Sequence, residues 1–276
     1  MRRLSPLAVG LAISLAMAAC SRSPEEAKAP EAPPAEPAAA AAAPTADSAA
    51  IDAAVASADR TAEDKERDAR SRPAEVLTFM ELRPGQHALD YFAAAGYYTE
   101  LMSRVVGPDG KVIAYNNDEY RKFSADGPTK RYGNNRLPNV AEVTTPVEAL
   151  ALEPASLDAV LFMQGYHDLY WRPKDGSWPQ TDPAKALAQL VPALKPGAVV
   201  VVVDHVANAG GDPTQTATSM HRIDPAIIKR DFAAAGLTLE SESPAFASSA
   251  DDHSKEVFDK AIRHKTDQVM YKFRKT

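Results

Sequence analysis

The chain alternates between short apolar runs and amphipathic segments from about residue 86 to its end. Apolar runs of strand length occupy residues 86–91, 111–115, 140–143, 157–163, 198–204, 237–241 and 269–273. Segments with apolar positions at helical spacing occupy residues 97–106, 184–194 and 225–235. The run 198–204 contains five consecutive valines, so it is apolar on both faces, as in a strand at the centre of a parallel sheet. Strands that alternate with helices at this spacing predict a doubly wound α/β domain.

Two further helical segments are expected outside this alternation. Residues 51–72 are rich in alanine and charged side chains, and they predict an N-terminal helix that is interrupted at Pro73. Between the last two strands, residues 255–264 predict a helical insert. The folded domain is therefore expected to span residues 51–276, a length that suits one α/β domain.

The N-terminal part of the chain has a different composition. Two arginines near the start precede an apolar stretch, residues 6–19, which is too short for a membrane span and ends at Cys20, the only cysteine. Residues 1–20 are interpreted as a lipoprotein signal peptide with Cys20 as the lipidation site. Plain secretion after cleavage at an Ala-x-Ala site is the alternative. Residues 21–50 are rich in alanine and proline and predict a disordered tether.

These features predict an exported protein that a lipid anchors in the cell envelope, with its domain in the periplasm. Ser21 follows Cys20, and the absence of aspartate at this position is typical of lipoproteins sent to the outer membrane. The net charge of −6 comes without a basic stripe, so nucleic acid is not an expected partner. No second apolar span follows in the sequence, and the expected membrane contact is the lipid anchor.

The segment 87–100 links the first strand of the alternation to the first helix. It runs from an apolar strand that ends near Asp90 into a turn of small residues, 92–96, and then into the helix. In doubly wound folds such a corner binds nucleotides, because the turn brings backbone N–H groups and a helix N-terminus to the ligand. This turn keeps one glycine, Gly96, where such corners usually contain three.

Polar residues follow the fourth and fifth predicted strands. His167 and Asp168 come after the fourth strand, and Asp204 and His205 end the fifth. Ligands of doubly wound sheets bind at the carboxyl ends of the strands, so these side chains are expected at one edge, near the corner. An imidazole beside a carboxylate suits proton abstraction at a catalytic site. The alternative is a histidine that caps the following loop and an aspartate that binds loop N–H groups.

Three more residues are expected near the same edge. His221 and Arg222 lie in the linker after the fifth strand, and Trp171 lies in a polar loop that suits a lid or a substrate wall. Packing of Trp171 onto the domain body is the alternative. Imidazoles and carboxylates gather here, but no spacing matches a recognised metal motif such as two histidines one helical turn apart. No metal site is predicted.

Several short motifs occur in an order typical of one superfamily. They are DARSRP at 68–73, GYYTE at 96–100, GYHD at 165–168, LKPG at 194–197, VDH at 203–205, HRID at 221–224 and FRK at 273–275. In these motifs the chain resembles class I S-adenosylmethionine-dependent methyltransferases, and more closely a family of predicted bacterial methyltransferases, many of them exported. The resemblance covers residues 59–276. It implies a Rossmann-like methyltransferase fold, whose mostly parallel seven-stranded sheet has an antiparallel last strand.

The resemblance also implies roles for individual residues. S-adenosylmethionine would be the cofactor, with Asp90 orienting its methionine moiety and Asn116 near its ribose. The expected cofactor contacts are Asp90, Ala94, Gly96, Tyr97, Asn116 and Asp118. The candidate catalytic residues are His167, Asp168 and His205, and the candidate substrate contacts are Asp204, His221, Arg222 and Trp171.

Two functions are consistent with these observations. The first is methyl transfer from S-adenosylmethionine to a small molecule, in which the protein mainly supplies alignment and desolvation. The second is an envelope protein that keeps the fold without the transfer chemistry and binds another ligand or a protein partner. The single glycine and the export signal favour the second, because S-adenosylmethionine is made in the cytoplasm. The polar residues at the sheet edge favour the first.

Overall fold

The seven predicted strands form one sheet. The computed structural model describes residues 45–276, in which the strands are β1 (His87–Tyr91), β2 (Lys111–Asn116), β3 (Val140–Thr144), β4 (Leu157–Met163), β5 (Leu194–His205), β6 (Leu237–Ser243) and β7 (Gln268–Lys275). Their order is β3-β2-β1-β4-β5-β7-β6, with β7 antiparallel to β5 and β6 and the other neighbours parallel. The predicted fold is confirmed. From β1 the chain adds β2 and β3 on one side of the sheet, and β4 then begins the other side. Sheets of this kind usually bind ligands in the crevice at the carboxyl ends of the two strands where this change occurs, here β1 and β4.

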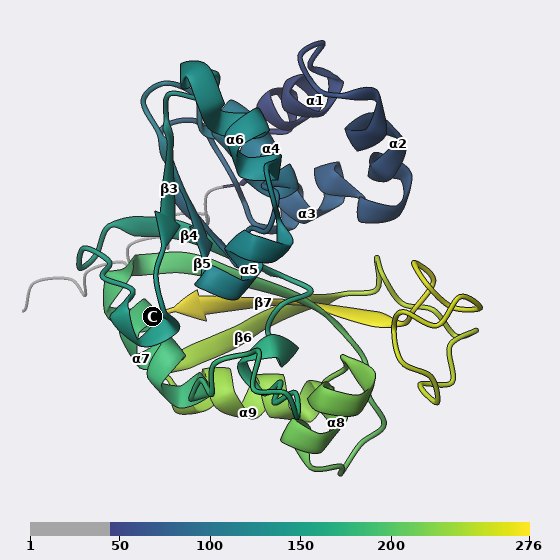
Figure 1. Cartoon of the computed structure of the whole chain (residues 1–276). Coiled ribbons are helices and arrows are strands. Elements are labelled where there is room, and N and C mark those ends of the chain that lie inside the picture. The colour runs from purple at the N-terminus through teal and green to yellow at the C-terminus, as the bar shows by residue number, and fades with distance from the viewer. Residues whose placement is uncertain (1–44) are drawn as a thin grey trace, which may run out of the picture. The chain divides into compact units, whose positions relative to one another are not determined.

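Helices cover both faces of the sheet. They are α1 (Ser48–Ala56), α2 (Ala62–Ser71), α3 (Pro73–Phe79), α4 (Tyr97–Val106), α5 (Asp118–Phe123), α6 (Gly127–Tyr132), α7 (Pro183–Ala193), α8 (Pro213–Met220) and α9 (Pro225–Ala234). Figure 1 shows α1, α3 and α4 together on one side of the sheet and α7 and α9 on the other. The helices predicted at 97–106, 184–194 and 225–235 are confirmed as α4, α7 and α9.

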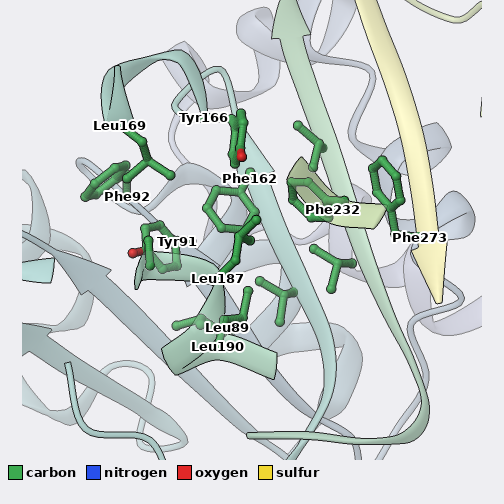
Figure 2. Close-up of a cluster of buried hydrophobic side chains, with 14 of the residues drawn as sticks. Leu89, Tyr91, Phe92, Phe162, Tyr166, Leu169, Leu187, Leu190, Phe232 and Phe273 are labelled. Atoms are coloured by element: carbon green, nitrogen blue, oxygen red, sulfur yellow. The ribbon is translucent and has the colours of Figure 1, made fainter. Parts of the chain in front are cut away.

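Alternate side chains of each strand enter two separate apolar cores. The even-numbered valines of β5 pack with residues of α7 and α9, whereas the odd-numbered valines pack with residues of α1, α3 and α4. This explains why the valine run is apolar throughout. Figure 2 shows part of the first core, in which the Phe232 ring stacks on Phe273 and meets Phe162 edge-on, with centroids 4.3 and 6.1 Å apart.

Two predicted helices differ from the structure. Residues 51–72 form two helices, α1 and α2, because the Thr61 hydroxyl caps a new helix by accepting from a backbone N–H of its first turn at 3.1 Å. Residues 255–264 form turns, so the helix predicted there is wrong. Asp259 accepts from the backbone N–H two residues on at 2.8 Å, and such local bonds compete with helix formation.

Three short helices lie in segments where the sequence predicts none. α5 and α6 occupy the polar stretch after β2, and α8 follows β5. Asn117 caps α5 and Asp212 caps α8, each through a side-chain oxygen that accepts a backbone N–H at 2.8 Å. Helices of six and eight residues are too short to show a clear apolar period.

The predicted signal peptide, Cys20 and residues 21–44 of the predicted tether lie outside the described residues. α1 begins at Ser48 and so includes the end of the segment predicted as tether. Within residues 45–276, no helix combines the length and the apolar character needed to cross a membrane.

Candidate functional site at the carboxyl edge of the sheet

The corner after β1 has an unusual backbone. Phe92, Ala94 and Gly96 have φ values of 61°, 49° and 80°, so every second residue of the turn is left-handed. This conformation is readily adopted by glycine but costs about 1–2 kcal/mol for a residue with a Cβ. Phe92 and Ala94 are therefore strained, and they occupy positions where corners of this kind usually have glycine.

Two sets of contacts hold the strained turn. The Asn116 Oδ1 accepts from the Ala94 N–H at 2.8 Å, and the Asn116 Nδ2 donates to the Ala94 carbonyl at 3.1 Å. The Phe92 ring stacks on Tyr120 and meets Tyr91 edge-on, with centroids 4.6 and 4.9 Å apart. Asn116, expected near a ribose, thus uses its amide to support the turn.

Asp90 ends the apolar part of β1 and is buried, with 3% of its surface exposed. Its Oδ2 accepts from the Thr99 hydroxyl at 2.6 Å, which links β1 to the first turn of α4. Burial raises the pKa of Asp90 to about 6, although the Thr99 hydrogen bond opposes this effect. A carboxylate destabilised in this way would be stabilised by a cationic or hydrogen-bond-donating ligand.

Residues 118–132, which contain α5 and α6, lie over the corner, and we call this segment the α5–α6 cover. At Gly96 an added Cβ would lie 1.6 Å from the Tyr132 hydroxyl oxygen, so Tyr132 fills the space beside the turn. At Gly127 an added Cβ would lie 2.7 Å from the Ala95 Cβ. The cover therefore rests directly on the turn, and both glycines permit the close approach.

Arg131 attaches the cover to the domain body. Its Nε donates to a carbonyl of the turn at 2.8 Å, and its Nη1 lies 2.6 Å from Asp64 Oδ2 and 2.5 Å from Glu100 Oε2. Glu100, on α4, also pairs with Arg104 and Arg136 at 2.9 and 2.7 Å. Burial raises the pKa of Glu100, but hydrogen bonds from these three arginines lower it overall to about 2.

Tyr120 extends the cover across the sheet edge, because its ring stacks on the turn while its hydroxyl donates to Asp168 after β4. The buried Tyr132 hydroxyl has no hydrogen-bond partner within residues 45–276, and neither has the Asn117 Nδ2. A buried polar group without a partner costs about 1–3 kcal/mol. Arg131 and Tyr120 thus bind the cover to the domain body, and the Tyr132 hydroxyl and the Asn117 amide are buried polar groups beside the corner.

Four polar side chains meet at the ends of β4 and β5, and we call His167, Asp168, Asp204 and His221 the polar cluster. The two Asp204 carboxylate oxygens contact the His167 N–H and Nδ1 at 2.8 and 2.7 Å. On the other side of the ring, His167 Nε2 lies 3.3 Å from Asp168 Oδ1. His221 Nδ1 lies 3.9 Å from the same oxygen. These residues, which come from three separate segments of the sequence, lie together at the edge where they were expected.

Burial and mutual interaction determine the charges of the polar cluster. Burial lowers the pKa of His167, but the carboxylates of Asp168 and Asp204 raise it overall to about 9. Burial opposes ionisation of Asp204, but His167 lowers the pKa of Asp204 below its ordinary value. The pKa of Asp168 is instead raised, because burial outweighs its contacts with His167 and Tyr120. Burial, together with the charge on His167, lowers the pKa of His221 to about 4. At neutral pH an imidazolium therefore lies between two carboxyl groups, beside a neutral His221.

Two other predicted site residues border the polar cluster. The His205 N–H donates to Asp204 at 2.8 Å, its Nδ1 lies 2.8 Å from the Thr266 hydroxyl, and burial lowers its pKa to about 3. The Trp171 ring packs against His221 with centroids 5.0 Å apart. His205 is thus a neutral neighbour of the cluster, and Trp171 forms part of its wall.

Three predicted contacts make other interactions. Arg222 is fully buried, donates to two loop carbonyls and pairs with Asp251 at 2.9 Å. The Tyr97 hydroxyl donates to Asp68 of α2 at 2.5 Å. Asp118 is exposed on the first turn of α5. With the cover closed, none of these three side chains lies in contact with the polar cluster.

The roles of Tyr120, Arg131 and Tyr132 are not visible in the sequence pattern, because these residues lie in short helices within a polar stretch. Two tyrosines and one phenylalanine in a mostly polar segment are the one signal that the sequence contains. A cavity of about 430 Å³ lies elsewhere, between α1, the end of α4 and residues 137–139, and the polar cluster does not line it.

Several solved structures have a fold similar to that of this chain. An S-adenosylmethionine-dependent methyltransferase from Aquifex aeolicus superposes with a TM-score of 0.51 at 21% identity, over 76% of this chain and 96% of the other. The complex between the Haloferax volcanii Trm112 methyltransferase activator and a methyltransferase gives a TM-score of 0.52 at 16% identity, over 77% and 92%. The fold is that of the class I methyltransferases.

Another similar structure is the [4+2]-cyclase SpnF, with a TM-score of 0.50 at 18% identity, over 78% of this chain and 81% of the other. No family model matches the chain, and no curated protein matches it. At these identities the similarity shows the fold alone, and the reaction must be argued from the residues of the site.

The class I fold implies S-adenosylmethionine, and the corner meets the backbone requirements for this cofactor. The alternating left-handed turn is present, and Asp90 ends the apolar part of β1. The Tyr132 side chain lies beside Gly96 while its own hydroxyl lacks a partner within the described residues. The backbone of the corner therefore suits the cofactor, but the Tyr132 side chain fills the space beside Gly96, so the cofactor would fit only if this side chain moved.

Proposed function

We propose that the protein transfers a methyl group from S-adenosylmethionine to a small molecule, and that the α5–α6 cover moves away before the cofactor binds. The strained turn is the observation that carries this proposal. Phe92 and Ala94 keep left-handed conformations that cost about 1–2 kcal/mol each. Strain of this kind persists where the surrounding structure enforces it, and it clusters at functional sites.

With the cover displaced, Asp90 and the backbone N–H groups of the turn would hold the amino-acid end of the cofactor. Asn116, the last residue of β2, is the polar residue expected near its ribose, whereas Asp118 begins α5 and would move with the cover. The bound cofactor supplies an electrophilic methyl group on a sulfonium. The protein supplies alignment and excludes water.

The polar cluster would act on the methyl acceptor. Asp204 holds His167 through Nδ1, which directs Nε2 toward Asp168. Because the carboxylates favour the imidazolium, His167 would orient the acceptor by donating from Nε2, and Asp168 would take the acceptor's proton. Tyr120 now binds the second oxygen of Asp168, so displacement of the cover would also release this carboxylate.

Calorimetric titration of the purified protein with S-adenosylhomocysteine tests the proposal. We expect a Kd of about 10–100 µM, since closure of the cover reduces the apparent affinity. Asp90→Ala should weaken binding at least tenfold, and Asp109→Ala, in an exposed turn, should leave it unchanged. No heat up to millimolar ligand from protein shown to be folded would refute methyl transfer.

The position of the α5–α6 cover over the corner supports a second function. In this alternative the protein binds another ligand or a protein partner and transfers no methyl group. Tyr132 and Tyr120 fill and bridge the corner, as expected if no cofactor enters it. Under this alternative neither S-adenosylmethionine nor S-adenosylhomocysteine binds, and ligands bind at the polar cluster only. The titration described above separates the two functions.

We also propose that the protein is exported and anchored in the envelope through a lipid on Cys20, with its domain in the periplasm and its anchor in the outer membrane. The support is the signal-like segment 1–20 and the position of the single cysteine. Mass spectrometry of the protein from envelope fractions should find a diacylglyceryl group on Cys20. Protein that retains residues 1–19 with an unmodified Cys20 would contradict this.

A further inference from the structure

We propose that the polar cluster binds a divalent transition-metal ion through His167, Asp168 and His221. Each residue offers one ligand atom, and these atoms lie within 4.8 Å of one another. Two imidazoles and a carboxylate form a common donor set for Zn²⁺ and Fe²⁺, in which three protein ligands leave positions open for water or substrate. Sequence spacing does not reveal the site, because His221 comes from a loop far along the chain.

Contacts behind the ligands orient two of them. In the neutral His167 ring, Asp204 would hold the proton on Nδ1 at 2.7 Å and leave the Nε2 lone pair for the metal. A carboxylate in this position is the usual partner of a metal-bound histidine. The Tyr120 hydroxyl binds Asp168 Oδ2 and leaves Oδ1 facing His167 Nε2 and His221 Nδ1.

The distances require a small movement of one ligand. Metal bonds of about 2.0–2.2 Å in a tetrahedral site separate neighbouring ligand atoms by about 3.3–3.6 Å. His167 Nε2 and Asp168 Oδ1, 3.3 Å apart, already have this separation. His221 follows the last turn of α8 and its side chain is 19% exposed, so it is the ligand best placed to move inward.

The charge of the cluster also suits a divalent cation. Asp168 and Asp204 are both buried, with 7% and 0% of their surface exposed. A divalent ion would balance both carboxylates, and unbalanced buried charge is costly. The His221 ring packs against Trp171 and the half-exposed Phe258, with ring centroids 5.0 Å apart in each pair, so these two aromatic rings border the site.

Titration of the full chain after removal of metal by a chelator tests the site, with Zn²⁺ followed by calorimetry and Co²⁺ by visible absorption. All proteins carry Cys20→Ser, which removes the one thiol. We expect one Zn²⁺ per chain and a visible band from protein-bound Co²⁺. His221→Ala and Asp168→Asn should each weaken Zn²⁺ binding at least 100-fold, and Asp204→Asn about 10- to 100-fold.

His253→Ala is the matched control, because His253 also pairs with a carboxylate, Asp267 at 3.0 Å, but lies outside the polar cluster. It should bind Zn²⁺ like the parent. Absence of Zn²⁺ binding by the parent, or equal binding by parent and His221→Ala, overturns the proposal. If Asp168→Asn fails to fold, His221→Ala alone decides the question. The measurement needs no S-adenosylmethionine, so the metal site can fail while the corner still binds the cofactor. A metal on His167 Nε2 and Asp168 Oδ1 would take the place of the acceptor contacts proposed above for these two side chains.

Discussion

Replacing Glu100 with glutamine is expected to lower the free energy of unfolding by about 3 kcal/mol at pH 7. Glu100 is 2% exposed, and nitrogens of Arg104, Arg131 and Arg136 lie 2.9, 2.5 and 2.7 Å from its carboxylate. Burial raises its pKa, but the arginines lower it from the ordinary 4.5 to about 2, a difference that corresponds to about 3 kcal/mol. Because Arg131 belongs to the α5–α6 cover, the substitution should also loosen the cover.

This loss should depend on pH in a defined direction. A carboxyl group with a lowered pKa in the folded state contributes stability above its unfolded pKa of 4.5, and the contribution disappears as the pH falls toward 2. Denaturant unfolding of both proteins at pH 7 and at about pH 3 should therefore show a difference that shrinks in acid. Glu75→Gln is the control, since its pair with Arg72 is exposed and contributes less than about 1 kcal/mol. An equal loss at both pH values would show that the ion pairs are not its cause.

Shortening Tyr132 to alanine is expected to tighten the binding of S-adenosylhomocysteine at least about tenfold. The Tyr132 hydroxyl oxygen would lie 1.6 Å from a Cβ on Gly96, so the side chain occupies the space beside the turn. A ligand that binds only the open form has an apparent Kd equal to its intrinsic Kd divided by the open fraction. Removing the ring should raise that fraction and lower the Kd measured by calorimetry.

Tyr132→Phe provides a control with the opposite expected sign. It keeps the ring and removes the hydroxyl that lacks a partner within residues 45–276. Relief of that buried group, which costs about 1–3 kcal/mol, should stabilise the closed cover. The phenylalanine variant should therefore bind S-adenosylhomocysteine no more tightly than the parent. If the alanine and phenylalanine variants bind equally well, the Tyr132 ring is not an obstacle to the cofactor.

The strands and the corner were predictable because their signals are local. The valine run of β5 is apolar at every position, and the structure buries it from both faces. The shift from an apolar strand to small residues at 92–96 marked the corner, although the left-handed angles of Phe92 and Ala94 depend on Asn116 and the packed Phe92 ring. The prediction that His167 and Asp204 lie at one edge of the sheet was possible because the carboxyl ends of neighbouring parallel strands lie at the same edge.

The cover and the close approach of His221 to the other proposed metal ligands were not predictable, because they depend on contacts between distant segments. α5 and α6 have six residues each, too few to show a period, and Tyr132 reaches Gly96 only in the folded chain. His221 approaches Asp168 because α8 and its loop fold over the ends of β4 and β5. The helix predicted at 255–264 is wrong for a different, local reason, since side chains such as Asp259 hydrogen-bond to the nearby backbone.

Locking the cover tests most directly whether it must move for the cofactor to bind. An added Cβ at Gly127 would lie 2.7 Å from the Ala95 Cβ, and a disulfide needs about 3.5–4.5 Å, so a small shift would allow the bond. The protein is Ala95→Cys/Gly127→Cys in a Cys20→Ser background, and Ala95→Ser/Gly127→Ser is its control. Calorimetric titration with S-adenosylhomocysteine should show no binding in the oxidised form and the control's affinity after reduction. Equal binding in the two forms would contradict the proposal that the covered corner is the cofactor site.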